Sequence, residues 1–179
     1  GIECDLTVAR LDKHTFYIVT GTGFATHDFS WIERNIPDGM DARLLDVTSA
    51  FAVLSLFGPR ARGVLGAVAG GHLWNTAFPF ATWRTVMIAG AAVRAIRITY
   101  VGELGWELYV PAEFALHVFD RIVAAGEEYG LVHAGYHAIN ACRTEKGYRH
   151  WGHDIGPEDD RLAAGLGFCV AWDKRSGFI

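Results

Sequence analysis

Short stretches of alternating hydrophobic and polar residues recur along the chain, and this period of two is typical of half-buried β-strands. Residues 3–11 and 16–19 form the first two stretches, and a polar segment at residues 12–14 separates them. The pattern predicts a β-hairpin in this part of the chain. Asp5 falls on the polar face of its first strand.

Several later stretches show the same strand pattern. Gly90 separates two of them, which favours a second hairpin. The strand that follows this hairpin is expected to join it, giving three antiparallel strands. The strands predicted after residue 40 cover residues 43–47, 51–57, 83–89, 91–100, 106–110 and 166–172.

Other segments repeat their apolar residues with the helical period of 3.6. The clearest begins at Pro111 and ends near Gly130, with Phe114, Val118 and Ile122 on one face. Strands outnumber helices and most neighbouring strands are predicted to be antiparallel. The fold class is therefore expected to be α+β, with largely antiparallel sheets and packed helices. The other predicted helices cover residues 26–36, 58–70 and 137–146.

The run at residues 100–108 differs from an ordinary connection, because two glycines and two carboxylates occur within a strand-like pattern. Glycine lets the backbone turn tightly or approach a ligand closely. Glu107 shares a face with Tyr109 in the strand that follows. The run predicts a binding turn, and a solvated pair of Glu107 and Tyr100 across two strands is the alternative.

Composition narrows the kinds of partner that we expect. The 179 residues are 51% hydrophobic, so the chain can bury a core, and the formal net charge of -4 argues against nucleic-acid binding. The three cysteines include no C-x-x-C pair, which favours a reducing compartment. No apolar run reaches the roughly 18 residues of a membrane span. We expect a small-molecule ligand and a cytoplasmic location, or the mitochondrial matrix in a eukaryote.

Four sequence runs occur in an order and at a spacing that one family shares: residues 5–8, 56–61, 100–108 and 143–154. They resemble the tetrahydrofolate-binding aminomethyltransferase family. This family includes the glycine cleavage system T protein and the C-terminal half of dimethylglycine and sarcosine dehydrogenases and oxidases. The version at residues 145–153 is more similar to the dehydrogenase group.

The resemblance implies a fragment of a longer, folate-binding fold, which agrees with a start that is not Met. Residues 1–40 would complete a first folate-binding subdomain, and residues 41–179 would form a second. Asp5 matches the family's catalytic aspartate. Glu107 and Tyr100 match residues that hold the pterin ring of tetrahydrofolate. No metal is implied.

The activity implied is one-carbon transfer to tetrahydrofolate, which forms 5,10-methylene-tetrahydrofolate. The substrate would be an iminium derived from an N-methyl amine, with FAD only in a domain outside this chain. Two departures from the glycine cleavage type are Ile139, where an arginine is expected, and Thr20, where an asparagine is expected. They favour a second hypothesis, a non-catalytic folate-binding or regulatory module.

Two other motifs in the chain have plainer interpretations. Residues 21–26 imitate a dinucleotide-binding glycine motif but lack its third glycine, so a tight connection from strand to helix is preferred. His133 and His137 have the spacing of metal ligands on a helix, but Gly135 lies between them and no cysteine or carboxylate completes the set. A structural loop is preferred there.

Overall fold

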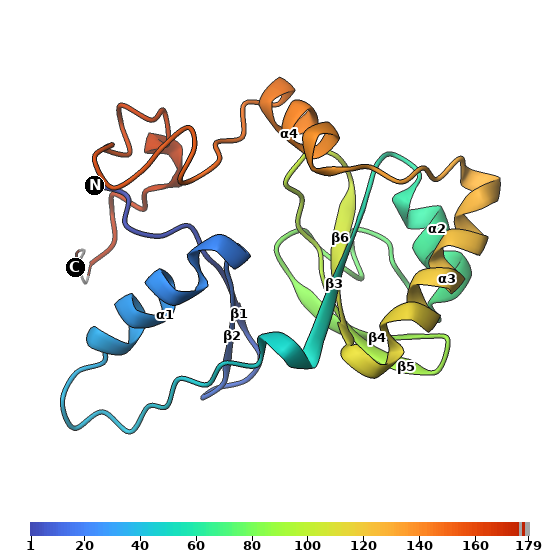
Figure 1. Cartoon of the computed structure of the whole chain (residues 1–179), viewed down its shortest axis with the longest axis horizontal. Helices are drawn as coiled ribbons and strands as arrows, with labels where there is room; N and C mark the ends of the chain where they lie inside the picture. Colours follow the sequence, from blue (N-terminus) through green and yellow to red (C-terminus); the bar gives the residue numbers. More distant parts are fainter. Residues whose placement is uncertain (176, 178–179) are drawn as a thin grey trace. The chain divides into compact units, whose positions relative to one another are not determined.

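The computed structural model describes residues 1–175 and 177, and they form two compact units. The first unit comprises Gly1–Ala42 and Arg149–Ile179, and the second comprises Arg43–Tyr148. Figure 1 shows that the first unit combines the two ends of the chain, coloured blue and red. Whether these units correspond to the two predicted folate-binding subdomains stays a prediction.

The first unit contains the predicted hairpin and a helix. Strands β1 (Thr7–Arg10) and β2 (Phe16–Val19) pair antiparallel, which confirms the hairpin, although the first strand begins at Thr7 and leaves Asp5 before it. A 3-10 turn, η1 (Thr22–Phe24), leads into helix α1 (Ala25–Arg34). The connection from strand to helix is tight, as expected for residues 21–26.

The C-terminal segment of this unit folds back on the N-terminal residues. The indole Nε1 of Trp151 donates a 2.6 Å hydrogen bond to the carbonyl of Ile2, and the Trp151 ring meets Phe24 edge to face, with centroids 4.8 Å apart. The first contact joins positions 149 residues apart in the sequence, and the second joins positions 127 residues apart. The C-terminal segment therefore packs against the N-terminal residues of the first unit.

The strand predicted at residues 166–172 is wrong. This segment contains a single 3-10 turn, η5 (Gly167–Cys169), and leaves the side chains of Phe168 and Trp172 exposed. A strand satisfies its backbone groups only by pairing with another strand. The described part of the segment pairs with none.

The second unit is built on a four-stranded antiparallel sheet in the order β3-β6-β5-β4. Its strands are β3 (Phe51–Phe57), β4 (Trp83–Ile88), β5 (Ala91–Ile96) and β6 (Gly105–Pro111). At the turn between β4 and β5, Ala89 and Gly90 both have positive φ, which is the conformation of a tight type I′ hairpin. The predicted strand at residues 43–47 is absent, and only η2 (Thr48–Ala50) precedes β3.

Helices cover this sheet on the face that forms the core. They are α2 (Ala61–Val68) and α3 (Ala115–Gly126), which η3 (Ala112–Phe114) precedes and η4 (Glu127–Tyr129) follows. Alternate residues of β6 point to them: Trp106, Leu108 and Val110 are fully buried. Helix α4 (Tyr136–Glu145) completes the unit. The predicted α+β class with antiparallel sheets and packed helices is confirmed.

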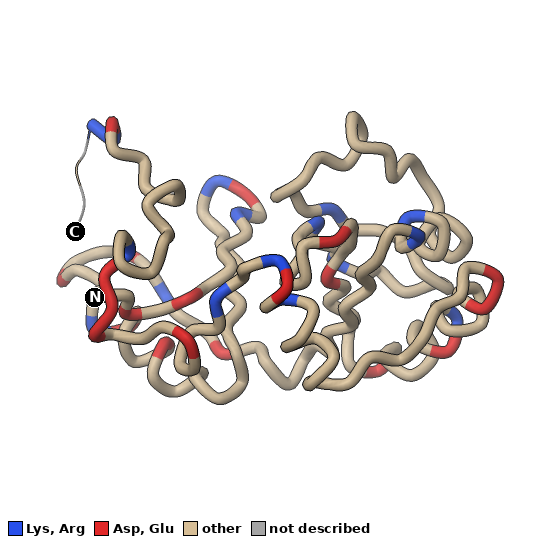
Figure 2. The backbone as a smooth tube through the Cα atoms, turned by 90° about the horizontal axis from the view of Figure 1, so that it is seen from above, with Lys and Arg blue, Asp and Glu red and all other residues tan. Residues whose placement is uncertain are grey.

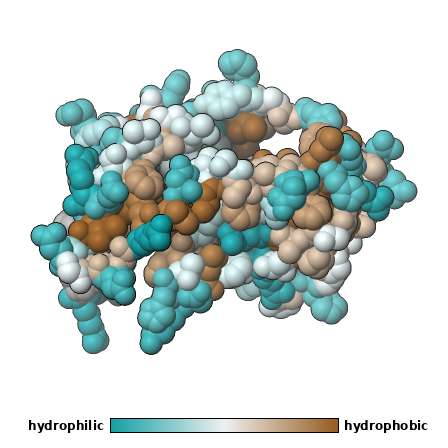
Figure 3. Space-filling model, turned by 60° about the horizontal axis from the view of Figure 1, so that its bottom comes forward, coloured by the Kyte–Doolittle hydropathy of each residue, from teal (hydrophilic) through white to brown (hydrophobic). Residues whose placement is uncertain are grey.

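The surface of the described residues is mixed in character. Figure 2 shows basic and acidic residues interspersed along the backbone of both units. Figure 3 shows apolar side chains that reach the surface between hydrophilic ones. Within the described part of the chain, no helix is both long and apolar enough to span a bilayer.

Candidate functional site

Glu107 lies on the central strand β6, which has a hydrogen-bonded neighbour on each side. Its cross-strand partners are Ser55 on β3 and Ile96 on β5. Because side chains alternate along a strand, Glu107 projects from the face opposite to the buried Trp106 and Leu108. Tyr100 is not a cross-strand partner of Glu107, so the solvated-pair alternative is wrong.

A tyrosine fixes the Glu107 carboxylate. The hydroxyl of Tyr109, two residues further along the same face, donates a 2.5 Å hydrogen bond to Glu107 Oε2. Burial raises the pKa of Glu107, and the hydrogen bond from Tyr109 opposes that rise. The site thus presents a half-buried carboxylate whose protonation is sensitive to its surroundings.

Tyr100 lies in the turn that leads from β5 to β6. Its ring meets that of Tyr148 at a centroid distance of 6.4 Å. The Thr99 hydroxyl accepts hydrogen bonds from the amides of Val101 and Glu103, both at 3.2 Å, which stabilises the turn. The predicted binding turn is therefore ordered by its own residues.

Helix α4 holds the other side of this turn. Lys146, just after the helix, forms a 3.1 Å ion pair with Glu103. Gly102 has φ +69°, and a Cβ there would lie 2.6 Å from Lys146 Cγ, so a glycine suits both the conformation and the close approach. The turn and α4 form one structural piece of the second unit.

Asp5 belongs to the first unit and precedes β1. Its side chain reaches the surface, yet the surrounding protein raises the pKa of Asp5, mainly by desolvation and also through the negative charge of Asp28; His150 acts in the opposite direction. The carboxyl is thus easier to protonate than an isolated aspartate. A cavity shared by Asp5 and Glu107 stays a prediction, because the two residues belong to different units.

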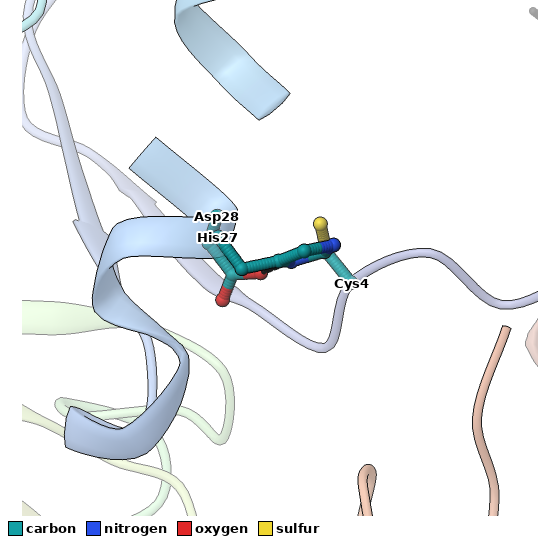
Figure 4. Close-up of side chains that lie close together, drawn as sticks. All are labelled: Cys4, His27 and Asp28. Carbon is teal, nitrogen blue, oxygen red and sulfur yellow. Dashed lines mark hydrogen bonds and ion pairs between the residues drawn. The ribbon is translucent and has the colours of Figure 1, made fainter. Parts of the chain in front are cut away.

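Among the described residues of the first unit, Asp28 is the buried carboxylate, and no sequence pattern pointed to it. Only 2% of the residue is exposed, although the preceding residue of α1, His27, is exposed. Burial alone would raise the pKa of Asp28, but hydrogen bonds from Thr20, His27 and Cys4 outweigh that effect and lower it. Figure 4 shows Cys4, His27 and Asp28 close together. Thr20, one of the two departures noted in the sequence, therefore has a defined structural role.

The alternative metal pair of His133 and His137 lacks the helical geometry that its spacing suggested. Helix α4 begins at Tyr136, with Gly135 as its N-cap, so His133 lies outside the helix and stacks on Phe119. Cys4, His27 and Asp28 have no recognised metal-binding spacing, so no sequence motif pointed to them.

The chain belongs to the family described as the GCVT N-terminal domain, which matches residues 1–174. It is 43% identical over 193 residues to mitochondrial sarcosine dehydrogenase of Mus musculus, covering 100% of this chain and 21% of that protein. It is 38% identical over 179 residues to mitochondrial dimethylglycine dehydrogenase of Mus musculus, covering 99% of this chain and 21% of that protein. The resemblance drawn from sequence motifs is confirmed. The chain spans about a fifth of the length of these relatives.

A solved structure shares the fold. Heterotetrameric sarcosine oxidase from Corynebacterium sp. U-96, in complex with pyrrole 2-carboxylate, superposes with a TM-score of 0.57 at 21% identity. The match covers 75% of this chain and 66% of that chain. Membership of this family implies chemistry related to folate and one-carbon transfer.

Proposed function

We propose that this chain is the tetrahydrofolate-binding part of an enzyme that oxidises an N-methyl amine, and that it takes part in transferring the resulting one-carbon unit. The substrate would be the iminium product of that oxidation, and the product would be 5,10-methylene-tetrahydrofolate. FAD would be bound by a domain outside this chain. Membership of the GCVT family over residues 1–174 is the observation that carries the proposal.

The donor and acceptor groups on β6 suit a pterin ring. A pterin presents an amino group and a ring N–H side by side, and a carboxylate can accept both hydrogen bonds. Tyr109 uses one of the roughly four acceptor positions of Glu107, which leaves others for a ligand. Tyr100 offers an aromatic face or a hydroxyl for the same ring.

Asp5 is proposed as the catalytic residue. Bound tetrahydrofolate would supply the nitrogen nucleophile that takes up the one-carbon unit. Asp5 would accept a proton and stabilise positive charge that develops next to its carboxylate. The raised pKa of Asp5, due first to desolvation and then to Asp28, makes it a stronger base than an isolated aspartate.

A non-catalytic folate-binding or regulatory module is the second candidate, and Thr20 is the observation that favours it. The Thr20 hydroxyl donates its hydrogen to Asp28. Where the glycine cleavage type has an asparagine, this chain therefore uses the side chain for internal structure. Ile139 likewise supplies no charge that could anchor an anionic ligand.

Calorimetric titration with tetrahydrofolate tests the binding proposal. We expect wild-type protein to bind and Glu107→Gln to bind at least about tenfold more weakly, because the amide offers one neutral acceptor in place of two charged ones and turns an N–H donor toward the ligand's N–H groups. Glu103→Gln is the matched control, since Glu103 pairs with Lys146 and has no proposed ligand contact. Equal affinities of the wild type and Glu107→Gln would contradict the pterin site.

Asp5→Asn separates the two candidate functions. In a catalytic domain, this variant should still bind tetrahydrofolate but should lose methylene-tetrahydrofolate formation above the uncatalysed background. Chromatographic measurement of that product from an iminium donor provides the readout. A wild-type rate equal to the background, together with intact binding, would favour the regulatory module.

A further inference from the structure

Three side chains of the kinds that bind transition metals meet in the first unit. Cys4 lies in the segment before β1, and His27 and Asp28 lie in the first turn of α1. The sulfur of Cys4, a ring nitrogen of His27 and a carboxylate oxygen of Asp28 all lie within 4.8 Å of one another. Figure 4 shows that the three side chains lie close together and come from these two segments.

We propose that Cys4, His27 and Asp28 form a binding site for a divalent cation of the zinc type. Thiolate, imidazole and carboxylate are the three ligand types that zinc uses in proteins, and three protein ligands with a water molecule complete a tetrahedral site. One thiolate and one carboxylate also neutralise the charge of a dication. This inference rests on observations other than those that support the proposed folate function.

The spacing between the ligand atoms requires little rearrangement. His27 Nδ1 lies 2.8 Å from Asp28 Oδ1, with a shared hydrogen between them. Two ligands about 2.1 Å from a tetrahedral ion lie roughly 3.4 Å apart. Replacing the shared hydrogen by the ion therefore needs the two atoms to separate by about half an ångström, which side-chain rotation provides.

Both polar ligands have a second partner that orients them. His27 Nε2 lies 3.2 Å from Glu3 Oε1, so a metal on Nδ1 would leave Nε2–H to donate to a carboxylate. Thr20 donates to Asp28 Oδ2 and leaves Oδ1 directed at His27. Histidine and carboxylate ligands of metal sites are typically held by such outer hydrogen bonds.

The site is accessible to ions from solvent, and binding an ion there would release one proton, from the Cys4 thiol. The His27 side chain is 40% exposed, so an ion can enter from solvent, while Asp28 anchors the inner side. Burial, followed by a hydrogen bond to Asp28, raises the pKa of Cys4 to about 12. The thiol is therefore protonated without an ion, and forming the metal–sulfur bond releases that proton to solvent.

Titration of the 179-residue chain with Co²⁺ under reducing, chelator-free conditions tests the proposal. We expect one equivalent to give visible bands of tetrahedral cobalt and a near-ultraviolet thiolate-to-cobalt band, both removed by added Zn²⁺. Zinc should also raise the thermal unfolding midpoint, because it binds the folded chain. The absence of the thiolate band from wild-type protein would overturn the proposal.

Matched variants assign the ligands. Cys4→Ser should abolish the thiolate band, whereas Cys142→Ser, which changes an exposed cysteine, should keep it. His153 is the control for His27, because its Nδ1 also contacts the carboxylate of the following residue, Asp154, at 2.9 Å. Among the described residues, His153 does not belong to a group of metal-ligand side chains that includes a cysteine. His27→Gln should weaken Co²⁺ binding at least about 100-fold, and His153→Gln should not.

The variant Glu3→Gln tests the site without changing a ligand, so it remains informative if His27→Gln does not fold. It leaves the three ligands in place and removes only the carboxylate beside His27 Nε2. Loss of such an outer partner typically costs about 10- to 100-fold in metal affinity. A thiolate band that persists in Cys4→Ser, or unchanged Co²⁺ affinity in Glu3→Gln with circular dichroism like the wild type, would contradict the site.

Discussion

The hydroxyl of Tyr109 donates a 2.5 Å hydrogen bond to Glu107 Oε2 within the same strand. The two residues are two positions apart, so the pleat of β6 places both side chains on one face. Tyr109 is 1% exposed and cannot move away from this contact without disturbing the packing around it. The position of the proposed pterin-binding carboxylate is therefore fixed by a buried neighbour.

Tyr109→Phe should raise the pKa of Glu107 further, because it removes the hydrogen bond that now opposes the effect of burial. We also expect the variant to lose about 1 kcal/mol of unfolding free energy, as is typical for one hydrogen bond. Carboxyl-carbon NMR titration measures the pKa, and denaturant unfolding measures the stability. Tyr136→Phe, at a residue with 68% exposure, is the control and should change neither.

The stability difference between wild type and Glu107→Gln should depend on pH. Burial raises the pKa of Glu107 in the folded chain, so the folded chain holds this proton more tightly than the unfolded chain does. Wild type should therefore lose stability relative to the variant as pH rises from the ordinary value of 4.5 through the folded pKa. Each tenfold difference in proton affinity corresponds to about 1.4 kcal/mol. Parallel stability curves across this range would show that burial does not perturb Glu107.

Gly105→Ala should destabilise the four-stranded sheet. A Cβ at this position would lie 2.2 Å from Phe57 Cδ1 and 2.6 Å from the backbone oxygen of Leu56, so the junction of β3 and β6 would have to shift. Overpacking of this kind costs about 1 to 3 kcal/mol. Gly70→Ala is the control, because its added Cβ meets no atom within 4 Å. Similar urea midpoints for both variants would contradict the prediction.

Thr20→Val should destabilise the first unit. The substitution keeps the shape of the side chain but removes a hydrogen-bond donor from the buried carboxylate of Asp28. A hydrogen bond to a charged group is worth about 1.5 to 3 kcal/mol, and we expect a loss in that range. Chemical denaturation followed by the fluorescence of Trp31 and Trp151 gives the measurement. The same change at Thr26, an exposed residue of α1, should have a much smaller effect.

The sequence predicted the elements whose partners are close in the chain. β4 and β5 are joined by the Ala89–Gly90 turn, and β6 follows them after a short connection, so local alternation and turn residues were sufficient. The amphipathic pattern of α3 was equally clear. The hairpin of β4 and β5 and the helix α3 obtain their backbone hydrogen bonds from residues close in the chain, whereas β6 also pairs along its whole length with the more distant β3.

The two wrong strands had a suitable pattern but no partner. Leu45 in the first segment is 64% exposed, and Phe168 in the second is 82% exposed. An apolar run can form a strand only where another strand's edge is available to it, and that depends on tertiary structure. Alternation along residues 43–47 and 166–172 contains no information about such an edge.

The candidate functional residues also fall into two groups: those that a local sequence pattern predicted and those that only the folded chain brings together. Glu107 and Tyr100 stood out because glycines and carboxylates interrupt one local run. Cys4, His27 and Asp28 could not be found, since their proximity depends on how the segment before β1 passes α1. A cysteine 23 residues from an adjacent histidine and aspartate has no distinguishing pattern until the chain is folded.

The central place of β6 in its sheet has a consequence for how a ligand would be captured. Ladders to β3 and β5 on either side restrain the backbone beneath Glu107. An incoming molecule would therefore meet an acceptor that is already aimed, and little conformational entropy would be lost on docking. The selectivity of this carboxylate would then depend on the shape of the ligand, because the protein would act as a rigid template.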